Sequence, residues 1–304
     1  MNKLLIKDNK DSFFFKAIDE AYIYMPTIKN ILFQNNIPKE FIYLAMVESH
    51  FSVLTHSNKE AVGIWQFTPE TATDYNLKIN RYIDERQDIV KSTQAAADFL
   101  NKLHIKFGKW YLAIIAYNCG AGRLSEAIYK AKSDKLAILL DENNSYIPKE
   151  SKRYLRKIIA YTLLGNNELF LLNKEYDHFL NIVNTYSMST VSLPAGESLQ
   201  RVSQIINMPL DKLKSLNKHL KYGFTPPNLK RYNIYIPYAK LAEFKQKYFE
   251  TLAHSSYKVH VVKKGDNLKM LSRKYNVSYI SLVTFNKLVS PKLNLEQELL
   301  IPIK

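Results

Sequence analysis

Glu48 is the carboxylate whose neighbours in the sequence best suit acid–base chemistry. The segment after Pro38 predicts a helix, on which Phe41, Leu44 and Ala45 share one apolar face. Glu48 falls on the same face. A carboxylate there loses water, which favours its neutral form and raises its pKa toward the range that a general acid needs. The pattern predicts a single acid/base at this position. The alternatives are a buried structural carboxylate and a side chain that frays into solvent at the helix end.

The elements around Glu48 are predicted to be helices throughout residues 12–173. Apolar residues recur three and four apart, and Gly or Pro ends each run. One such run covers residues 89–107, and a glycine follows it. Residues 110–117 are nearly all apolar, which predicts a core helix. The glycines of residues 120–122 then predict a loop before a short helix at 123–132.

The sequence beyond about Val183 changes to short strands, turns and short helices, and it contains an internal repeat. Residues 257–302 read as a strand, two short helices and a closing strand, a βααβ order. Asp266 and Ser278 are predicted to cap the two helices. Residues 191–237 repeat this order in a more degenerate form.

Both copies resemble the LysM module, which binds chains that contain N-acetylglucosamine, such as peptidoglycan. In the last copy the resemblance rests on the turn at 265–268, on Leu282 and Asn286, and on the final Ile301-Pro302. The first copy, at 188–240, is either a second binding module or a spacer that kept the fold without the groove.

Four separated motifs follow one another in the helical region. They are Glu48-Ser49, Gly63-Ile64-Trp65-Gln66, Ala116-Tyr117-Asn118 and the segment from Ile147 to Tyr154. In this order they resemble the soluble lytic transglycosylases of glycoside hydrolase family 23.

The two resemblances imply a mainly α fold, with a lysozyme-like helical catalytic domain followed by small α+β (βααβ) LysM modules. The expected organisation is an N-terminal extension at 1–14, a lytic transglycosylase domain at 15–180, a degenerate LysM-like module at 188–240 and a LysM module at 256–304.

The resemblance also implies a mechanism. Glu48 would protonate the glycosidic oxygen between N-acetylmuramic acid and N-acetylglucosamine and then deprotonate the muramic C6 hydroxyl. An internal 1,6-anhydro ether forms without water, so one carboxylate suffices where most glycosidases use two. No cofactor is implied. The residues expected to line the cleft are Ser57, Gln66, Tyr117, Asn118 and Tyr154, with Tyr117 near Glu48.

Each of these residues also has an ordinary structural explanation. Tyr117 suits a core aromatic residue, Gln66 and Asn118 suit helix ends, and Ser57 suits a turn. Glu150 lies among Lys149, Lys152 and Arg153, which favours a surface ion pair. His50 stands where this family usually has glycine, which bears on the geometry of the local turn.

Two other functions remain open at this point. A lysozyme-like hydrolase would need a second carboxylate to activate water, and Asp74, Asp84 and Glu85 are the candidates, although residues 84–86 read better as a capping and ion-pair segment. A catalytically inactive protein that binds peptidoglycan through LysM is the other alternative.

The composition restricts the partners. With 43 Lys+Arg against 28 Asp+Glu the formal charge is +15, which favours polyanions. LysM favours peptidoglycan glycan strands over nucleic acid, for which no recognisable module is present. The single cysteine, Cys119, cannot form an intramolecular disulfide, and no Cys or His spacing suggests a metal site.

The start of the chain shows no signal peptide, because its apolar run is far too short. No window approaches the ~20 apolar residues of a membrane span. By resemblance we expect a periplasmic or cell-envelope protein. Peripheral or lipid-anchored membrane association and the oligomeric state stay open.

Overall fold

The computed structural model describes residues 13–173, 187–250 and 257–302. The chain divides into two compact units: Met1–Asn80 with Asp84–Met188, and Arg81–Ile83 with Ser189–Lys304. Among the described residues, no helix is both long enough and apolar enough to cross a membrane.

The first unit is built from helices. In chain order they are α1 (Phe13–Ala21), α2 (Met25–Gln34), the 3-10 helix η1 (Lys39–Phe41), α3 (Ile42–Ser49), α4 (Pro69–Asp74), the 3-10 helix η2 (Glu85–Gln87), α5 (Ile89–Phe107), α6 (Trp110–Cys119), α7 (Ala121–Ala131), α8 (Leu136–Leu139), α9 (Lys149–Gly165) and α10 (Glu168–Asn173).

The ends of α5 follow from the residue types at its caps. The Asp88 carboxylate accepts hydrogen bonds from the backbone N–H groups of Val90 and Lys91, both at 3.0 Å. At the other end Gly108 adopts a left-handed conformation with φ 71°. Asp is favoured as an N-cap and Gly as a left-handed C-cap, so the predicted helix at 89–107 forms with these bounds.

The link between α6 and α7 is shorter than predicted. Gly120 alone makes the turn, with φ 87° and ψ 143°, and α7 begins at Ala121 instead of Arg123. Glycine reaches this conformation without a Cβ clash, so one residue redirects the chain and Gly122 joins the first turn of α7.

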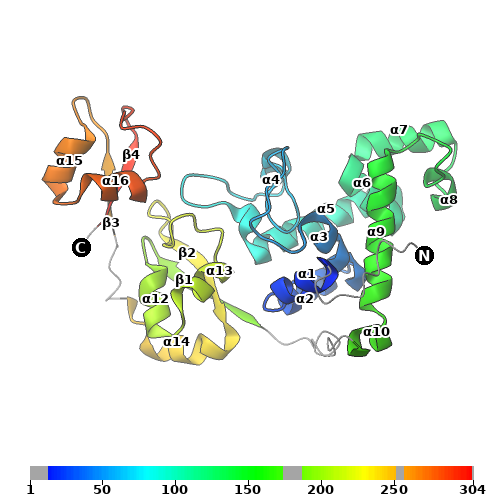
Figure 1. Cartoon of the computed structure of the whole chain (residues 1–304), viewed down its shortest axis with the longest axis horizontal. Coiled ribbons are helices and arrows are strands. Elements are labelled where there is room, and N and C mark those ends of the chain that lie inside the picture. The colour runs from blue at the N-terminus through cyan, green and yellow to red at the C-terminus, as the bar shows by residue number, and fades with distance from the viewer. Residues whose placement is uncertain (1–12, 174–186, 251–256, 303–304) are drawn as a thin grey trace. The chain divides into compact units, whose positions relative to one another are not determined.

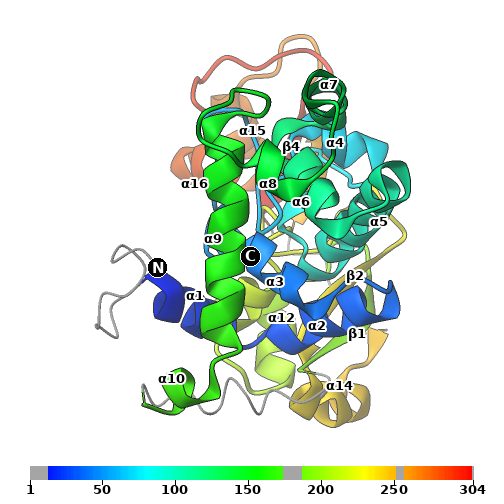
Figure 2. The same cartoon turned by 90° about the vertical axis from the view of Figure 1, so that its right-hand side faces the viewer.

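The long helix α9 organises the unit. It packs against α3 and α6, while α5 packs against α2 and α6. In both views α7 and α8 lie at the N-terminal end of α9, and α10 lies at its C-terminal end (Figure 1, Figure 2). Side chains from one half of α9 can therefore meet α3 and α6 together.

The second unit contains two modules with the same order of elements. The first has β1 (Met188–Pro194), α12 (Leu199–Ile205), α13 (Leu210–Leu216) and β2 (Arg231–Pro237). The second has β3 (Tyr257–Val261), α15 (Leu268–Tyr275), α16 (Tyr279–Phe285) and β4 (Glu298–Pro302). β3 and β4 pair antiparallel, from Tyr257 opposite Pro302 to Val261 opposite Glu298. β2 is followed by a 3-10 turn, η3 (Tyr238–Lys240), and by α14 (Leu241–Lys247), neither of which was predicted from the sequence.

Corresponding asparagines brace the two modules in the same way. Asn217 donates to the carbonyl of Tyr235 at 2.7 Å and accepts from its N–H at 2.8 Å. Asn286 donates to the carbonyl of Leu300 at 2.8 Å and accepts from its N–H at 2.7 Å. Each asparagine thus continues the hydrogen bonding of its module's closing strand, which supports the internal repeat.

One predicted cap is wrong. Asn267, not Asp266, caps α15, because its side chain accepts from the N–H of Met270 at 3.0 Å. Asp266 is one residue too early and instead accepts hydrogen bonds from the N–H of Lys263 and the ring of His260. Ser278 caps α16 as predicted.

The predicted fold class, a mainly α domain followed by small α+β modules, is confirmed. Most of the predicted extension 1–14 lies outside the described residues, and α1 begins at Phe13. The boundaries 15–180, 188–240 and 256–304 stay predictions at the level of single residues.

Candidate active site

Glu48 lies near the end of an interior helix. Pro38 precedes the 3-10 turn η1, and α3 then buries every residue from Ile42 to Met46. Glu48 follows two residues later and keeps part of its surface exposed. The chain turns away at once, because His50 and Phe51 both adopt left-handed conformations, with φ 54° and 61°. The Glu48 carboxyl group therefore lies where a buried helix reaches the protein surface.

The surroundings of Glu48 shift its acidity. Burial raises the pKa of the Glu48 carboxyl to about 7. This value is the net result of three causes: burial is the largest, the 2.5 Å hydrogen bond that Tyr154 donates to Oε1 lowers the pKa, and the charge of Glu150 raises it. At neutral pH the carboxyl is protonated in a large share of molecules, so it can both give and take a proton.

Two tyrosines lie beside this carboxyl group. Tyr154 is buried on α9, and burial and the Glu48 charge hold its pKa well above the ordinary value. Tyr117 on α6 donates to the carbonyl of Trp65 at 2.7 Å. Its pKa is also raised well above the ordinary value, by burial and by the charge of Glu48. Both phenols therefore stay protonated and act as donors.

The segment between α3 and α4 forms a wall next to Tyr117. Gln66, with φ 51°, donates from its amide nitrogen to the carbonyls of Thr55 at 3.1 Å and Gly63 at 2.8 Å. Within the described residues its carbonyl oxygen has no hydrogen bond in the structure. It is therefore placed to accept a hydrogen bond from an N–H group of a ligand.

Hydrogen bonds from Arg86 and Ser49 hold this segment between α3 and α4 in place. The buried side chain of Arg86 binds both carboxylate oxygens of Asp84, at 2.9 and 2.7 Å, and donates to the carbonyl of Glu60 at 2.7 Å. Ser49 donates to the carbonyl of Ile64 at 3.0 Å. These bonds give Ser49 a structural role and support the predicted capping and ion-pair role of residues 84–86.

Three of the predicted cleft residues, Gln66, Ser57 and Asn118, have no direct contact with Glu48 in the described part of the chain. Ser57 is exposed, and its hydroxyl accepts from the N–H groups of Lys59 and Ala61, as a turn residue does. Asn118 accepts a hydrogen bond of 2.6 Å from Ser151, which ties α6 to α9. Their roles toward a substrate stay predictions.

Glu150 and Ser151 lie beside the candidate site, and this position was not predicted from the sequence. Glu150 forms no ion pair with Lys149, Lys152 or Arg153 within the described residues, and it acts on the charge state of Glu48 instead. The helical spacing in the sequence could have indicated this position of Glu150, because Glu150 lies four residues before Tyr154 and so on the same face of α9.

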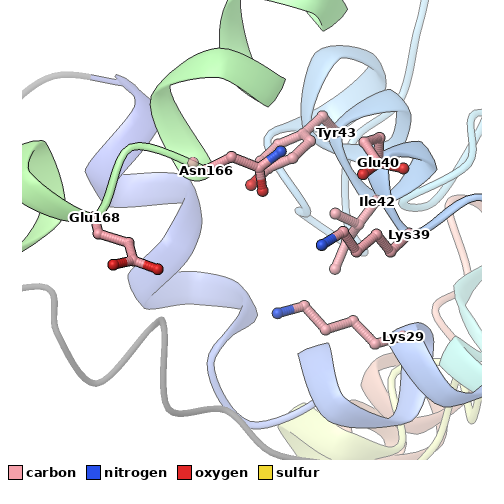
Figure 3. A pocket seen from close by; sticks show the side chains of 8 residues that line it. Lys29, Lys39, Glu40, Ile42, Tyr43, Asn166 and Glu168 are labelled. Atoms are coloured by element: carbon pink, nitrogen blue, oxygen red, sulfur yellow. The ribbon is translucent and has the colours of Figure 1, made fainter.

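A separate cavity lies at the opposite ends of α3 and α9. Lys29 and Lys39 extend into it, and Tyr43 and Asn166 border it (Figure 3). Burial and the charge of Lys39 lower the pKa of Lys29. Asn166 lies twelve residues beyond Tyr154, about 18 Å along a helix, so this cavity is not part of the active site.

Comparisons with known families and proteins agree with this arrangement. Residues 26–139 match the family described as "Transglycosylase SLT domain". Residues 187–251 match "Lytic transglycosylase MltD, LysM-like domain", and residues 260–302 match "LysM domain". The chain thus carries a transglycosylase SLT domain followed by two LysM-type domains.

The chain is similar to membrane-bound lytic murein transglycosylase D from Escherichia coli strain K12, with 29% identity over 91% of this chain. The same identity and coverage hold for the protein of that name from Escherichia coli O6:H1. This chain spans 63% of the length of these relatives. A putative tributyltin chloride resistance protein from an Alteromonas species is 39% identical over 38% of this chain and 55% of its own length. A solved lytic transglycosylase Slt from Pseudomonas aeruginosa, an inactive mutant, matches with a TM-score of 0.38 and 19% identity, over 49% of this chain and 24% of its own.

Proposed function

We propose that this protein is a peptidoglycan lytic transglycosylase in which Glu48 is the single acid and base. The observation that carries the proposal is a half-buried carboxyl group with a pKa of about 7, hydrogen-bonded to a protonated tyrosine, inside an SLT domain. The cell envelope is the corresponding location, and we propose the periplasm within it.

The reaction uses the two protonation states of Glu48 in turn. The carboxyl proton passes to the glycosidic oxygen as the bond between this oxygen and muramic C1 breaks. The protonated oxygen leaves as a hydroxyl group of N-acetylglucosamine. The carboxylate then removes the proton of the muramic C6 hydroxyl, whose oxygen bonds to C1. Atoms balance without water, and Glu48 returns to its protonated form.

The remaining cleft residues hold the substrate in this proposal. The free carbonyl oxygen of Gln66 accepts from an acetamido N–H group, and the muramic acetamido group stabilises the positive charge that develops at C1. Tyr154 keeps the Glu48 carboxyl oriented. The last LysM module binds the glycan strand.

The products distinguish the proposal from hydrolysis. Purified sacculi digested with the protein are expected to release muropeptides with 1,6-anhydro ends, lighter by one water than reducing ends. Mass spectrometry of the digest measures this difference. Reducing ends as the main product would replace the proposal by the lysozyme-like alternative.

The structure gives that alternative little support. Asp84 is bound to Arg86, and Glu85 forms an ion pair with Lys91. Asp74 is exposed on α4. Among the described carboxylates, Glu150 is the one whose charge acts on Glu48, so it is the residue to test as a water-activating base.

The pH dependence of kcat/KM should respond in opposite directions to changes at Glu150 and Tyr154. Activity needs protonated Glu48, so it falls as pH rises through about 7. Glu150→Gln removes a charge that raises the pKa of Glu48, so the alkaline limb moves to lower pH. Tyr154→Phe removes a hydrogen bond that lowers this pKa, so the limb moves to higher pH. Rates of glycan cleavage between pH 5 and 9 measure both shifts.

Loss of all activity in Glu150→Gln, at every pH, would identify Glu150 as a second catalytic carboxylate and would contradict the single-acid mechanism. If the alkaline limb of the pH dependence of kcat/KM does not move in either variant, the ionisation of Glu48 does not determine that limb.

A further inference from the structure

A cavity of about 380 Å³ opens between α7 and the segment that leads into α9. α7 contributes Arg123, Glu126, Ala127 and Lys130, and the segment contributes Ser145, Tyr146 and Pro148. Its lining therefore combines a guanidinium group, an ammonium group, a carboxylate, a hydroxyl group and an aromatic ring. None of these residues belongs to the set predicted for the cleft.

The wall of this cavity is held in place by a buried lysine. Lys152 on α9 is 1% exposed, and its ammonium group donates to the carbonyls of Asp141 and Asn144, the latter at 2.7 Å. Arg156 on the same helix donates to the carbonyl of Leu140 at 2.8 Å and pairs with Glu142. The segment before Tyr146 is thus fixed to α9, and the cavity is formed before any ligand arrives.

Arg123 is the charge in this cavity that remains available. Lys130 and Glu126 neutralise each other in an ion pair of 2.6 Å. Arg123 is exposed, and within the described residues its guanidinium group has no hydrogen bond or ion pair in the structure. A free guanidinium group at the rim of a preformed cavity suits a carboxylate, which it can bind through two parallel hydrogen bonds.

The cavity lies close to the catalytic groups. Burial raises the pKa of the Cys119 thiol, while a hydrogen bond with Ser151 and the positive charge of Arg123 both act to lower it, so Arg123 and Ser151 both lie near Cys119 at the end of α6. Ser151 in turn binds Asn118. Pro148 at the rim is six residues before Tyr154, about 9 Å along α9. A ligand in the cleft therefore comes within reach of Arg123 through a short side branch.

We propose that this cavity binds the short peptide carried by the muramic residue, with Arg123 holding a carboxylate of that peptide. The inference rests on the proposed function, because it takes peptidoglycan as the substrate. Arg123 then selects glycan strands by their peptide branch, while Glu48 performs the cleavage.

The test compares two substrates and two variants. Glycan strands that bear peptides and strands stripped of peptides by an amidase are digested by the wild-type protein, by Arg123→Gln and by Lys106→Gln. Lys106 is exposed on α5, so its variant has the same loss of charge away from the cavity. Arg123→Lys, which keeps the charge without the paired hydrogen bonds, gives an intermediate result.

Arg123→Gln is expected to lower kcat/KM about 10-fold on peptide-bearing strands, as for the loss of a charged hydrogen bond, and to leave stripped strands unaffected. Lys106→Gln should change neither substrate by more than about 2-fold, as for a screened surface charge. Equal losses on both substrates, or no loss on either, would overturn the assignment of the cavity. The 1,6-anhydro ends of the products report separately on the proposed function, since their absence in the wild-type digest would contradict that function whatever Arg123 does.

Discussion

Replacing Glu48 with glutamine is expected to lower the turnover of glycan strands by about 10³-fold or more, the scale of a lost general acid and base. Glutamine keeps the size and polarity of the side chain but cannot give a proton to the glycosidic oxygen. Sacculus binding should be unchanged, because the LysM modules lie in residues 187–302. Release of muropeptides and sedimentation with sacculi measure the two properties.

A deletion after Ser187 is the matched control, and it should weaken sedimentation first. Turnover close to the wild-type rate in Glu48→Gln would contradict the proposed role of Glu48. Loss of sacculus binding in Glu48→Gln would mean that the helical unit, and not LysM, provides most of the affinity for sacculi.

The pH dependence of the stability of Glu48→Gln, compared with that of the wild type, tests the pKa of Glu48. The folded-state pKa of about 7 lies above the ordinary value of 4.5, so the protonated side chain favours the folded state. This contribution is complete below about pH 4.5 and is lost as pH rises through about 7. At pH 8 Glu48→Gln should therefore be more stable than wild type by up to about 3 kcal/mol, and at pH 4.5 the two should be similar. Thermal or urea unfolding of the helical unit at both pH values measures the difference.

Local patterns explain which parts of this active site were predictable. The helix at 42–49 follows from apolar periodicity and the interior helix at 110–119 from a nearly unbroken apolar run, and a carboxylate on the first of them was bound to be desolvated. The position of Tyr117 near Glu48 was an expectation from resemblance. The structure supplies a physical reason for it, since α6 and α3 both pack against α9.

Other features depend on contacts between distant segments, which periodicity does not contain. The lysines around Glu150 predicted an ion pair, but Lys152 turns inward to bind backbone carbonyls and leaves Glu150 to act on Glu48. Asp266 and Asn267 are both good caps, and the register of the turn decides between them. Ser57 is a turn residue by its observed bonds, and its role toward substrate stays a prediction.

Replacing Gly63 with alanine is the second change with a large expected effect. Gly63 has φ +84°, and a Cβ atom there would stand 2.1 Å from the carbonyl oxygen of Arg86. That oxygen belongs to backbone, and the Arg86 side chain is fixed by Asp84, so it cannot move aside. Positive φ costs an alanine about 1–2 kcal/mol, and overpacking adds about 1–3 kcal/mol. Unfolding of the helical unit should therefore become easier by about 2–5 kcal/mol.

Gly108→Ala separates the two causes. Gly108 also has a positive φ, of +71°, but no heavy atom lies within 4 Å of its Cβ position. This variant meets only the backbone strain, so it should lose about 1 kcal/mol. Equal losses in the two variants, measured by urea unfolding, would show that the close approach to Arg86 does not matter.

Activity should separate the variants more sharply than stability does. Gly63 donates to Thr55 at 3.1 Å and accepts from the side chain of Gln66 at 2.8 Å, so a shift of its backbone moves Gln66. The neighbouring Trp65 carbonyl, which holds Tyr117, moves with it. A displacement of about 1 Å in positioning groups can lower a rate by about 10²-fold. Gly63→Ala should therefore lose about this much turnover at a temperature where it is still folded. Gly108→Ala, at the far end of α5, should keep its turnover, because none of its strain reaches the wall that carries Gln66.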